Sequence, residues 1–197
     1  MVRKRTDMIA ETRAKLIAAA RREFAAKGYA DSAMEDLTAE AGLTRGALYH
    51  HFGGKPGLLA AVIAQIDDEM TERLNAIADR AETRWRGFLD ELEAYMEMSL
   101  EPEIQRIVLL DGPAVLGDPS RWPSQMACIR TTKRSLELMV EEGTIRPIDV
   151  DATARLVSGA ALGGTLWIAG ADDPKEASKQ VVRSLTLLVS GLLSQPE

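Results

Sequence analysis

Apolar residues recur every three or four positions along most of the chain, and no stretch alternates apolar and polar residues as half-buried strands do. The clearest helical pattern lies in 56–82, where Leu58, Val62, Ile66 and Met70 share one face. We therefore expect an all-α protein.

Turn residues between the periodic stretches predict where each helix begins and ends. We expect three helices in a helix-turn-helix DNA-binding domain, 1–56, and about six in a helical ligand-binding and dimerisation domain, 57–197. A basic, disordered arm is expected over 1–6 and a loop over 111–124. The predicted helices cover 7–27, 33–41, 45–51, 56–82, 85–100, 102–110, 124–142, 151–168 and 174–193.

The stretch 32–52 predicts two short helices joined by a tight turn. Ser32 and Glu35 form an S-x-x-E capping box, in which each side chain accepts a hydrogen bond from an otherwise unpaired backbone N–H. Gly42 suits the left-handed conformation that ends a helix. Thr44 can then cap the second helix.

This second helix should leave a cationic, hydrogen-bonding face exposed. Leu48 points inward, whereas Arg45, Tyr49 and His50 remain outside. A short helix docked across such a turn has the helix-turn-helix geometry that fits the major groove of DNA. An ordinary helical hairpin would show the same turn, so the turn alone leaves both interpretations open.

The residues after the turn favour the first interpretation, because TRGALYHHFGGKPGLL resembles the DNA-binding segment of the TetR family of bacterial regulators. The resemblance covers 12–63. Thr38 departs from it, since the family usually carries alanine there, and we expect only a small adjustment of the helix pair. The matching residues are Thr44, Arg45, Gly46, Ala47, Leu48, Tyr49, His50, His51, Phe52 and Lys55.

The resemblance implies a homodimeric transcriptional regulator, more often a repressor than an activator. It implies a palindromic double-stranded DNA operator and a small-molecule effector. Arg45 and Ala47 would reach base edges. Thr44, Tyr49, His50 and Lys55 would contact phosphates. The expected DNA-binding residues are Ser32, Thr44, Arg45, Gly46, Ala47, Tyr49, His50 and Lys55.

The last two predicted helices have the composition of a subunit interface. Small residues concentrate in 151–168, and a broad apolar stripe runs along 174–193. In TetR-like proteins these helices pair with those of a second subunit, although two interior helices would have a similar composition. The expected interface residues are Gly159, Gly163, Val181, Leu185, Leu188 and Leu192.

The segment 85–167 holds most of the aromatic residues and several methionines. Such residues often form plain core, but the resemblance to the TetR family implies a ligand pocket among these helices. We expect a mainly hydrophobic or aromatic ligand, because no cluster of buried charge is evident. The expected wall residues are Tyr95, Met98, Trp122, Met126 and Trp167.

The formal charge of −6 argues against a nucleic-acid partner until its distribution is considered. Residues 1–56 carry ten Lys and Arg against seven Asp and Glu, whereas the remainder carries fourteen against twenty-three. A basic N-terminal domain next to an acidic body is typical of a protein that binds DNA through the former. A chance fluctuation of surface charge would produce a similar contrast.

Other features limit the protein class. The longest uncharged run, 156–171, is shorter than the roughly 18 apolar residues of a membrane span. No signal peptide is visible, so we expect a cytoplasmic protein without a membrane partner. Cys128 is the only cysteine, which excludes an internal disulfide and favours a buried thiol. No cofactor or metal is expected.

The sequence leaves two rivals to a ligand-controlled repressor. An enzyme is disfavoured because His50 and His51 are the only histidines, their side chains should diverge on a helix, and no nucleophile or carboxylate has a spacing suited to a triad or metal site. The alternative is a helix-turn-helix protein that acts as an activator, or as a protein-interaction module without a ligand. A module that does not bind DNA should have lost the outward cations, yet Arg45 and Lys55 are present.

Overall fold

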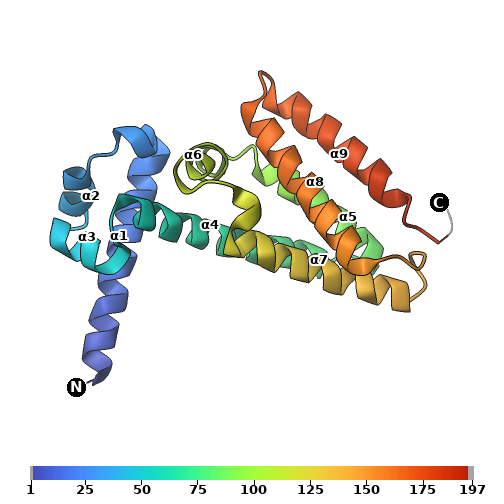
Figure 1. The fold of residues 1–197 in the computed structure, drawn as a ribbon, viewed down its shortest axis with the longest axis horizontal. Helices are drawn as coiled ribbons and strands as arrows, with labels where there is room; N and C mark the ends of the chain where they lie inside the picture. Colours follow the sequence, from blue (N-terminus) through green and yellow to red (C-terminus); the bar gives the residue numbers. More distant parts are fainter. Residues whose placement is uncertain (1, 195–197) are drawn as a thin grey trace. The chain divides into compact units, whose positions relative to one another are not determined.

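The computed structural model describes residues 2–194, with side chains described from Asp7 onward, and this part of the chain contains nine α-helices (Figure 1). Within it no strand forms, and the one β-type pairing is an isolated antiparallel bridge between Ile145 and Leu193. The all-α expectation is confirmed.

The residues form two compact units. The first consists of Met1–Ile66 and Arg106–Gly117, and the second of Asp67–Gln105 and Asp118–Glu197. The first unit is therefore larger than the predicted 1–56 domain, because it includes ten more residues of a long helix and a segment from the middle of the chain. The functional boundary at residue 56 stays a prediction.

The first unit is built on α1 (Val2–Asp31), α2 (Met34–Glu40), α3 (Arg45–Phe52) and the beginning of α4 (Lys55–Ala78). The helix α1 begins at Val2, so the disordered arm expected over 1–6 is wrong for residues 2–6, and Met1 lies outside the described residues. Non-helical dihedral angles at Gly28 interrupt α1 one residue after its predicted end. The fully buried side chains of this unit include Leu16, Phe24, Leu37, Leu48 and Leu58.

The turn between α2 and α3 forms as the sequence predicts, but the start of α2 does not. Gly42 has φ 66°, and the Thr44 hydroxyl accepts a hydrogen bond from the Ala47 N–H at 3.2 Å. The Ser32 hydroxyl, in contrast, donates to the Gly28 carbonyl at 2.7 Å, and Ala33 is the N-cap of α2 without any side-chain cap. The capping box is wrong because the interruption of α1 leaves a carbonyl that competes for the Ser32 hydroxyl.

Thr38 of α2 and Gly57 of α4 are the two residues that the packing around α3 constrains most visibly. The Thr38 hydroxyl donates within its own helix, to the carbonyl groups of Met34 and Glu35 at 3.0 and 3.1 Å, so the buried threonine leaves no unpaired polar group. A Cβ on Gly57 would overlap the Phe52 carbonyl oxygen. Only glycine therefore allows α4 to begin directly against the end of α3.

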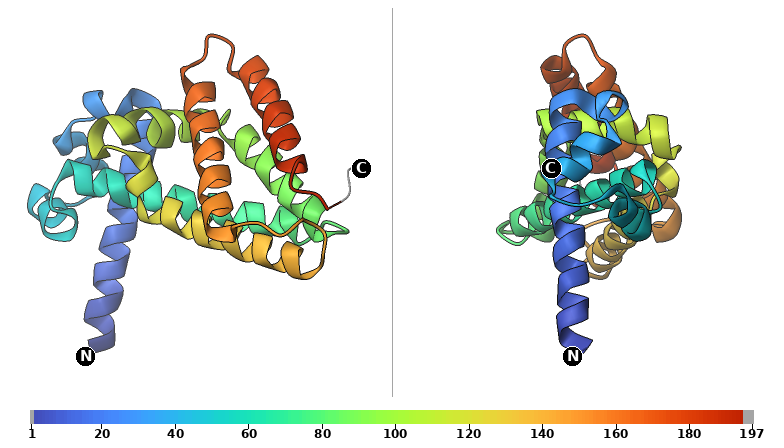
Figure 2. Two further views of the ribbon diagram at one scale, coloured as in Figure 1. Left: turned by 45° about the vertical axis from the view of Figure 1, so that its right-hand side comes forward. Right: turned by 90° about the vertical axis from the view of Figure 1, so that its left-hand side faces the viewer.

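The second unit contains the rest of α4 together with α5 (Arg84–Met98), α7 (Pro123–Glu141), α8 (Val150–Gly170) and α9 (Pro174–Ser190). The helices α8 and α9 lie antiparallel, side by side (Figure 2). Gly164 allows this approach, because a Cβ there would lie 2.7 Å from a methyl group of Val181.

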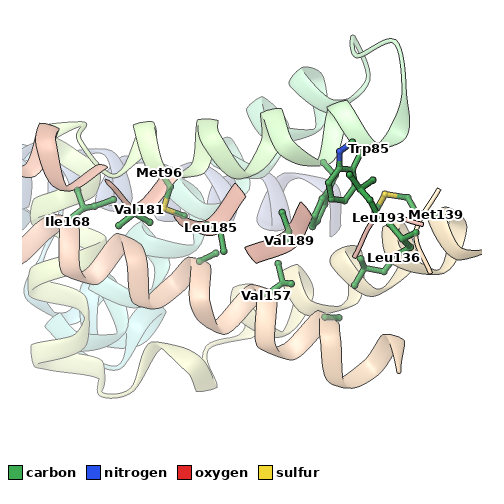
Figure 3. Packing of buried hydrophobic residues seen from close by; sticks show 14 of the residues in the cluster. Trp85, Met96, Leu136, Met139, Val157, Ile168, Val181, Leu185, Val189 and Leu193 are labelled. Atoms are coloured by element: carbon green, nitrogen blue, oxygen red, sulfur yellow. The ribbon is translucent and has the colours of Figure 1, made fainter. Parts of the chain in front are cut away.

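The core of this unit joins four of its helices (Figure 3). Met96 of α5, Val157 and Ile168 of α8, and Leu185 and Val189 of α9 are all buried in one cluster. Leu136 and Met139 of α7 are also fully buried there. The inward side of the apolar stripe on α9 therefore packs in the core of its own chain.

The segment between α5 and α7 differs from its prediction. It contains η1 (Ile104–Asp111), which is a π-helix, then α6 (Gly112–Leu116) and the 3₁₀ turn η2 (Pro119–Arg121). The loop expected over 111–124 is thus partly helical. Pro113 is compatible with helix in the first turn of α6, so its presence did not exclude a helix there.

Candidate DNA-binding face and ligand cavity

The exposed face of α3 presents the side chains that the sequence assigned to DNA. Arg45, Gly46, Tyr49 and His50 are exposed, while Leu48 is fully buried and anchors the helix on its other side. The Thr44 cap orders the first turn of α3. A short helix with one buried anchor and an exposed polar face has the form required to enter the major groove.

Arg45 forms an ion pair across the turn. Its Nη1 lies 2.7 Å from Oε1 of Glu35, on α2, and both side chains are exposed. An exposed pair of this kind contributes only about 0.2–1 kcal/mol. Glu35 can therefore orient Arg45 without preventing it from changing partner.

Lys55 lies in a more enclosed environment than an ordinary surface lysine. Its ammonium group stands 4.3 Å from the centroid of the Tyr29 ring. Burial lowers the pKa of Lys55, while the charges of Asp111 and Asp31 act in the opposite direction. Lys55 is half-buried. Its charge is consequently held at the beginning of α4.

The segment from the middle of the chain supports this arrangement inside the first unit. The Tyr29 N–H donates to Oδ2 of Asp111 at 2.8 Å, and Asp111 also pairs with Arg106 at 3.3 Å. Arg106 in turn donates to the Lys27 carbonyl at 3.4 Å. Sequence reasoning missed Arg106 and Asp111 because their partners lie about eighty residues away in sequence.

Two expectations about α3 and its surroundings need correction. Ser32 is only 1% exposed and its hydroxyl is used by the Gly28 carbonyl, so this side chain is not available to DNA. His50 and His51 do not diverge, because their ring centroids lie 5.1 Å apart in an edge-to-face contact. The His51 carbonyl accepts a hydrogen bond from Arg13 at 2.7 Å.

The predicted interface residues divide into two groups. Gly159, Gly163 and Leu188 are on the surface, and nothing would meet a Cβ within 4 Å at either glycine. Val181 and Leu185 are only 7% and 6% exposed because they pack in the core of their own chain, so their assignment to an interface is wrong. Leu192 is half-buried against the same core.

Several large apolar side chains of α8 and α9 remain exposed. Sequence reasoning missed Leu156 and Leu187, which lie one and two positions from the buried Val157 and Leu185. We name as the α8–α9 apolar face the residues Leu156, Trp167, Leu187 and Leu188, which are 73, 55, 76 and 70% exposed.

A cavity of about 250 Å³ lies in the second unit, among α4, α5, α7 and α8. Tyr95 is the only predicted wall residue that lines it. Met98 is buried elsewhere, Trp122 is half-buried, and Met126 and Trp167 are exposed. The other four predicted residues are not in the cavity wall: Met98, Met126 and Trp167 lie on helix faces turned away from it, and Trp122 lies between η2 and α7.

The cavity wall also contains carboxyl groups that the sequence analysis did not expect. Burial raises the pKa of Asp67 to about 6, although a hydrogen bond with Ser124 acts in the opposite direction and Asp68 adds to the rise. Burial also raises the pKa of Glu91. The expectation that no cluster of buried charge lies in the pocket is therefore wrong, because two partly buried carboxyls share its wall.

Cys128 also differs from its prediction. It lines the cavity and is exposed, whereas the sequence favoured a buried thiol. Tyr95 faces the same space, and burial raises the pKa of its hydroxyl, which interacts with Thr165. Apolar wall is supplied by residues such as Leu74, Phe88 and Val157. The cavity is thus amphipathic.

The described residues do not suggest a metal centre or a membrane segment. No group of three or more His, Cys, Asp or Glu side chains in this part of the chain could hold a metal ion. No helix in the same part is long and apolar enough to cross a membrane.

Comparison with known proteins gives matches over both units. Residues 16–62 match the profile described as bacterial regulatory proteins, tetR family, and residues 85–192 match a tetracyclin repressor-like C-terminal domain. The HTH-type transcriptional regulator TtgR of Pseudomonas putida is 29% identical, over 73% of this chain and 67% of its own. The HTH-type transcriptional repressor AcnR of Corynebacterium glutamicum is 29% identical, over 80% of this chain and 88% of its own.

A solved structure matches nearly the whole chain. The crystal structure of a TetR-family transcriptional regulator from Pectobacterium atrosepticum is 50% identical, covers 97% of this chain and 98% of its own, and superposes with a TM-score of 0.90. Together with the helix-turn-helix and the two matching domains, this similarity shows that the chain is a DNA-binding transcriptional regulator of the TetR family.

Proposed function

We propose that the protein is a homodimeric repressor that leaves its operator when a small molecule enters the cavity among α4, α5, α7 and α8. The observation that carries the proposal is the exposed face of α3, with its capped first turn and buried Leu48 anchor. Residues 1–56 would bind DNA, and residues 57–197 would bind the effector and the second subunit. A repressor of this kind acts in the cytoplasm, where bacterial DNA lies.

The DNA-binding side chains divide by the kind of contact they can make. Arg45 and Ala47 would face base edges, where arginine pairs with guanine and the alanine methyl contacts thymine. Thr44, Tyr49, His50 and Lys55 would contact phosphates, and Gly46 would let the backbone of α3 come close to the DNA. When the protein binds DNA, Arg45 leaves Glu35 and pairs with a base, so Glu35 competes with the DNA for Arg45.

The second subunit would cover the α8–α9 apolar face. Leu156, Leu187 and Leu188 are the most exposed large apolar side chains of the described residues, and exposed apolar surface of this kind marks an interaction site. Gly159 and Gly163 leave room for a helix to approach between the leucines and Trp167. A two-fold dimer presents two α3 helices, which suits half-sites about 34–36 Å apart on a palindromic operator.

Release of the operator would pass through α4 and the segment 106–111. The helix α4 lines the cavity from Asp67 to Asn75, and its first residue, Lys55, lies against Tyr29. Asp111 holds the Tyr29 backbone. A ligand that displaces α4 by a small amount would change the separation of the two α3 helices. An effector that prefers the displaced form by about 3 kcal/mol lowers operator affinity roughly a hundredfold.

The test is a fluorescence-anisotropy titration with DNA from upstream of the protein's own gene, compared with scrambled DNA, and a parallel reporter assay. Specific binding together with lower reporter expression supports a repressor. Higher reporter expression would instead indicate an activator. Equal affinity for both DNA sequences would contradict operator recognition, and a monomer by light scattering at micromolar concentration would remove the dimer.

A further inference from the structure

The cavity wall is acidic. Asp67 and Asp68 come from α4 and Glu91 from α5, and no Lys, Arg or His is among the residues that line the space. The half-buried carboxyls of Asp67 and Glu91 have been withdrawn from water without a compensating positive charge. Carboxylates in such surroundings favour the approach of a cation.

The polar partners that do reach these carboxyls are neutral. Ser124 hydrogen-bonds Asp67, and no positively charged side chain of the described residues acts on the carboxyl of Asp67 or of Glu91. The Cys128 thiol is within electrostatic reach of both acids but adds no positive charge. The charge of the wall is therefore unbalanced within the described part of the chain.

From this juxtaposition we infer that the cavity binds a small organic cation, with its positive group between Asp67 and Glu91 and its apolar part against Phe88 and Leu74. The inference rests on the proposed function, because it names the class of effector for the same site. Aromatic side chains at Phe88 and Tyr95 suit such a ligand, since ring faces attract cations. A metal ion does not fit, because the described acids and thiol form no group with metal-ligand geometry.

The size of the cavity limits the ligand. At about 250 Å³ it lies just below the roughly 300–1,000 Å³ of sites for drug-sized molecules. We therefore expect a ligand of about the size of a single ring that carries an amidinium or quaternary ammonium group. The neutral hydroxyl groups of Ser124, Thr132 and Ser158 can orient the substituents of such a ligand.

Binding of a cation should depend on pH. Asp67 faces Asp68 on its own helix, Glu91 and Tyr95 on α5, and Cys128 on α7, and α8 brings no titratable group to the wall. Cation binding requires the carboxylate form of Asp67. Affinity should therefore fall as the pH falls through about 6, where Asp67 takes up its proton.

The experiment is isothermal titration calorimetry on the full chain with benzamidine, benzyltrimethylammonium and benzamide. Benzamidine and benzamide have nearly the same shape, but only benzamidine is a cation, and the quaternary probe keeps its charge at every pH. We expect both cations to bind about tenfold or more tightly than benzamide. Glu91→Gln and Asp67→Asn should each weaken cation binding by a similar factor, whereas Glu93→Gln, on the exposed side of α5, should not.

Three results overturn the inference: equal affinity for benzamidine and benzamide, no binding of either cation at millimolar concentration, or unchanged cation affinity in folded Glu91→Gln protein. Circular dichroism establishes that each variant is folded. Operator release is measured separately by anisotropy. Cations that bind without releasing DNA contradict the proposed function alone, whereas release by a neutral compound, with no cation binding, contradicts the cation inference alone.

Discussion

The half-buried carboxyl of Asp67 should destabilise the folded protein at neutral pH. Its pKa of about 6 lies above the ordinary value of 3.8, chiefly because burial disfavours the charged form. Each pKa unit corresponds to about 1.4 kcal/mol, so ionisation of Asp67 costs the folded state about 3 kcal/mol at neutral pH. Replacing it with Asn removes this cost and keeps an acceptor for the Ser124 hydroxyl.

The pH dependence follows from the direction of the shift. Between 3.8 and about 6 the folded protein binds the proton and the unfolded chain does not, so the contribution of Asp67 to stability is lost as pH rises through this window. Asp67→Asn should therefore raise the free energy of unfolding by up to about 3 kcal/mol above about pH 7, with a gain in Tm of roughly 6–12 °C. Below about pH 4 the two proteins should be equally stable.

Urea denaturation followed by circular dichroism, repeated from about pH 4 to about pH 8, measures this difference. Glu72→Gln, which changes an exposed carboxyl on the same helix, is the matched control and should show little change at any pH. A difference between Asp67→Asn and wild type that stays constant across the pH range, or a destabilised variant at neutral pH, would refute the reasoning.

Three further predictions concern DNA binding and assembly. Arg45→Ala should weaken operator binding by about 1–3 kcal/mol and binding to other DNA only slightly, whereas Lys55→Ala should weaken binding to all sequences and reduce the slope of affinity against salt by about one unit. Anisotropy titrations at several salt concentrations separate these roles. Equal losses of affinity on operator and other DNA in both variants would contradict them. Glu35→Gln should strengthen operator binding because it removes the competing partner of Arg45 and a negative charge near phosphate, and an unchanged affinity would indicate that the ion pair does not compete. Leu188→Glu should give a folded monomer by light scattering, whereas Leu185→Ala should instead lower the free energy of unfolding by about 2–5 kcal/mol as a core substitution; a dimeric Leu188→Glu protein would exclude the α8–α9 apolar face.

The sequence by itself determined the features that depend on neighbours in the chain. Thr44 caps α3 through the Ala47 N–H three residues later, Gly42 makes the turn, and the spacing of apolar residues gives the helices. These interactions need only the local backbone, so a pattern in the sequence is enough to predict them. The exposed face of α3 followed from the same spacing, since Leu48 had to be buried.

The tertiary structure decided which of several possible partners each side chain takes. Ser32 could have capped α2 locally, but its hydroxyl instead donates a hydrogen bond to the carbonyl of Gly28, where α1 is interrupted. Leu185 and Leu188 belong to one apolar stripe, and only the packing of α9 on α8 makes the first a core residue and the second a surface residue.

The cavity illustrates the same limit. Asp67 and Glu91 have the charged character of surface positions in the sequence, and only the packing of α4 and α5 with α7 and α8 places them together in a partly apolar space. Likewise, Asp111 and Tyr29 meet across 82 positions of the chain. Periodicity predicts which residues share a face of one helix, but it contains no information about the rotation of one helix relative to another, and that rotation determines the wall of the cavity.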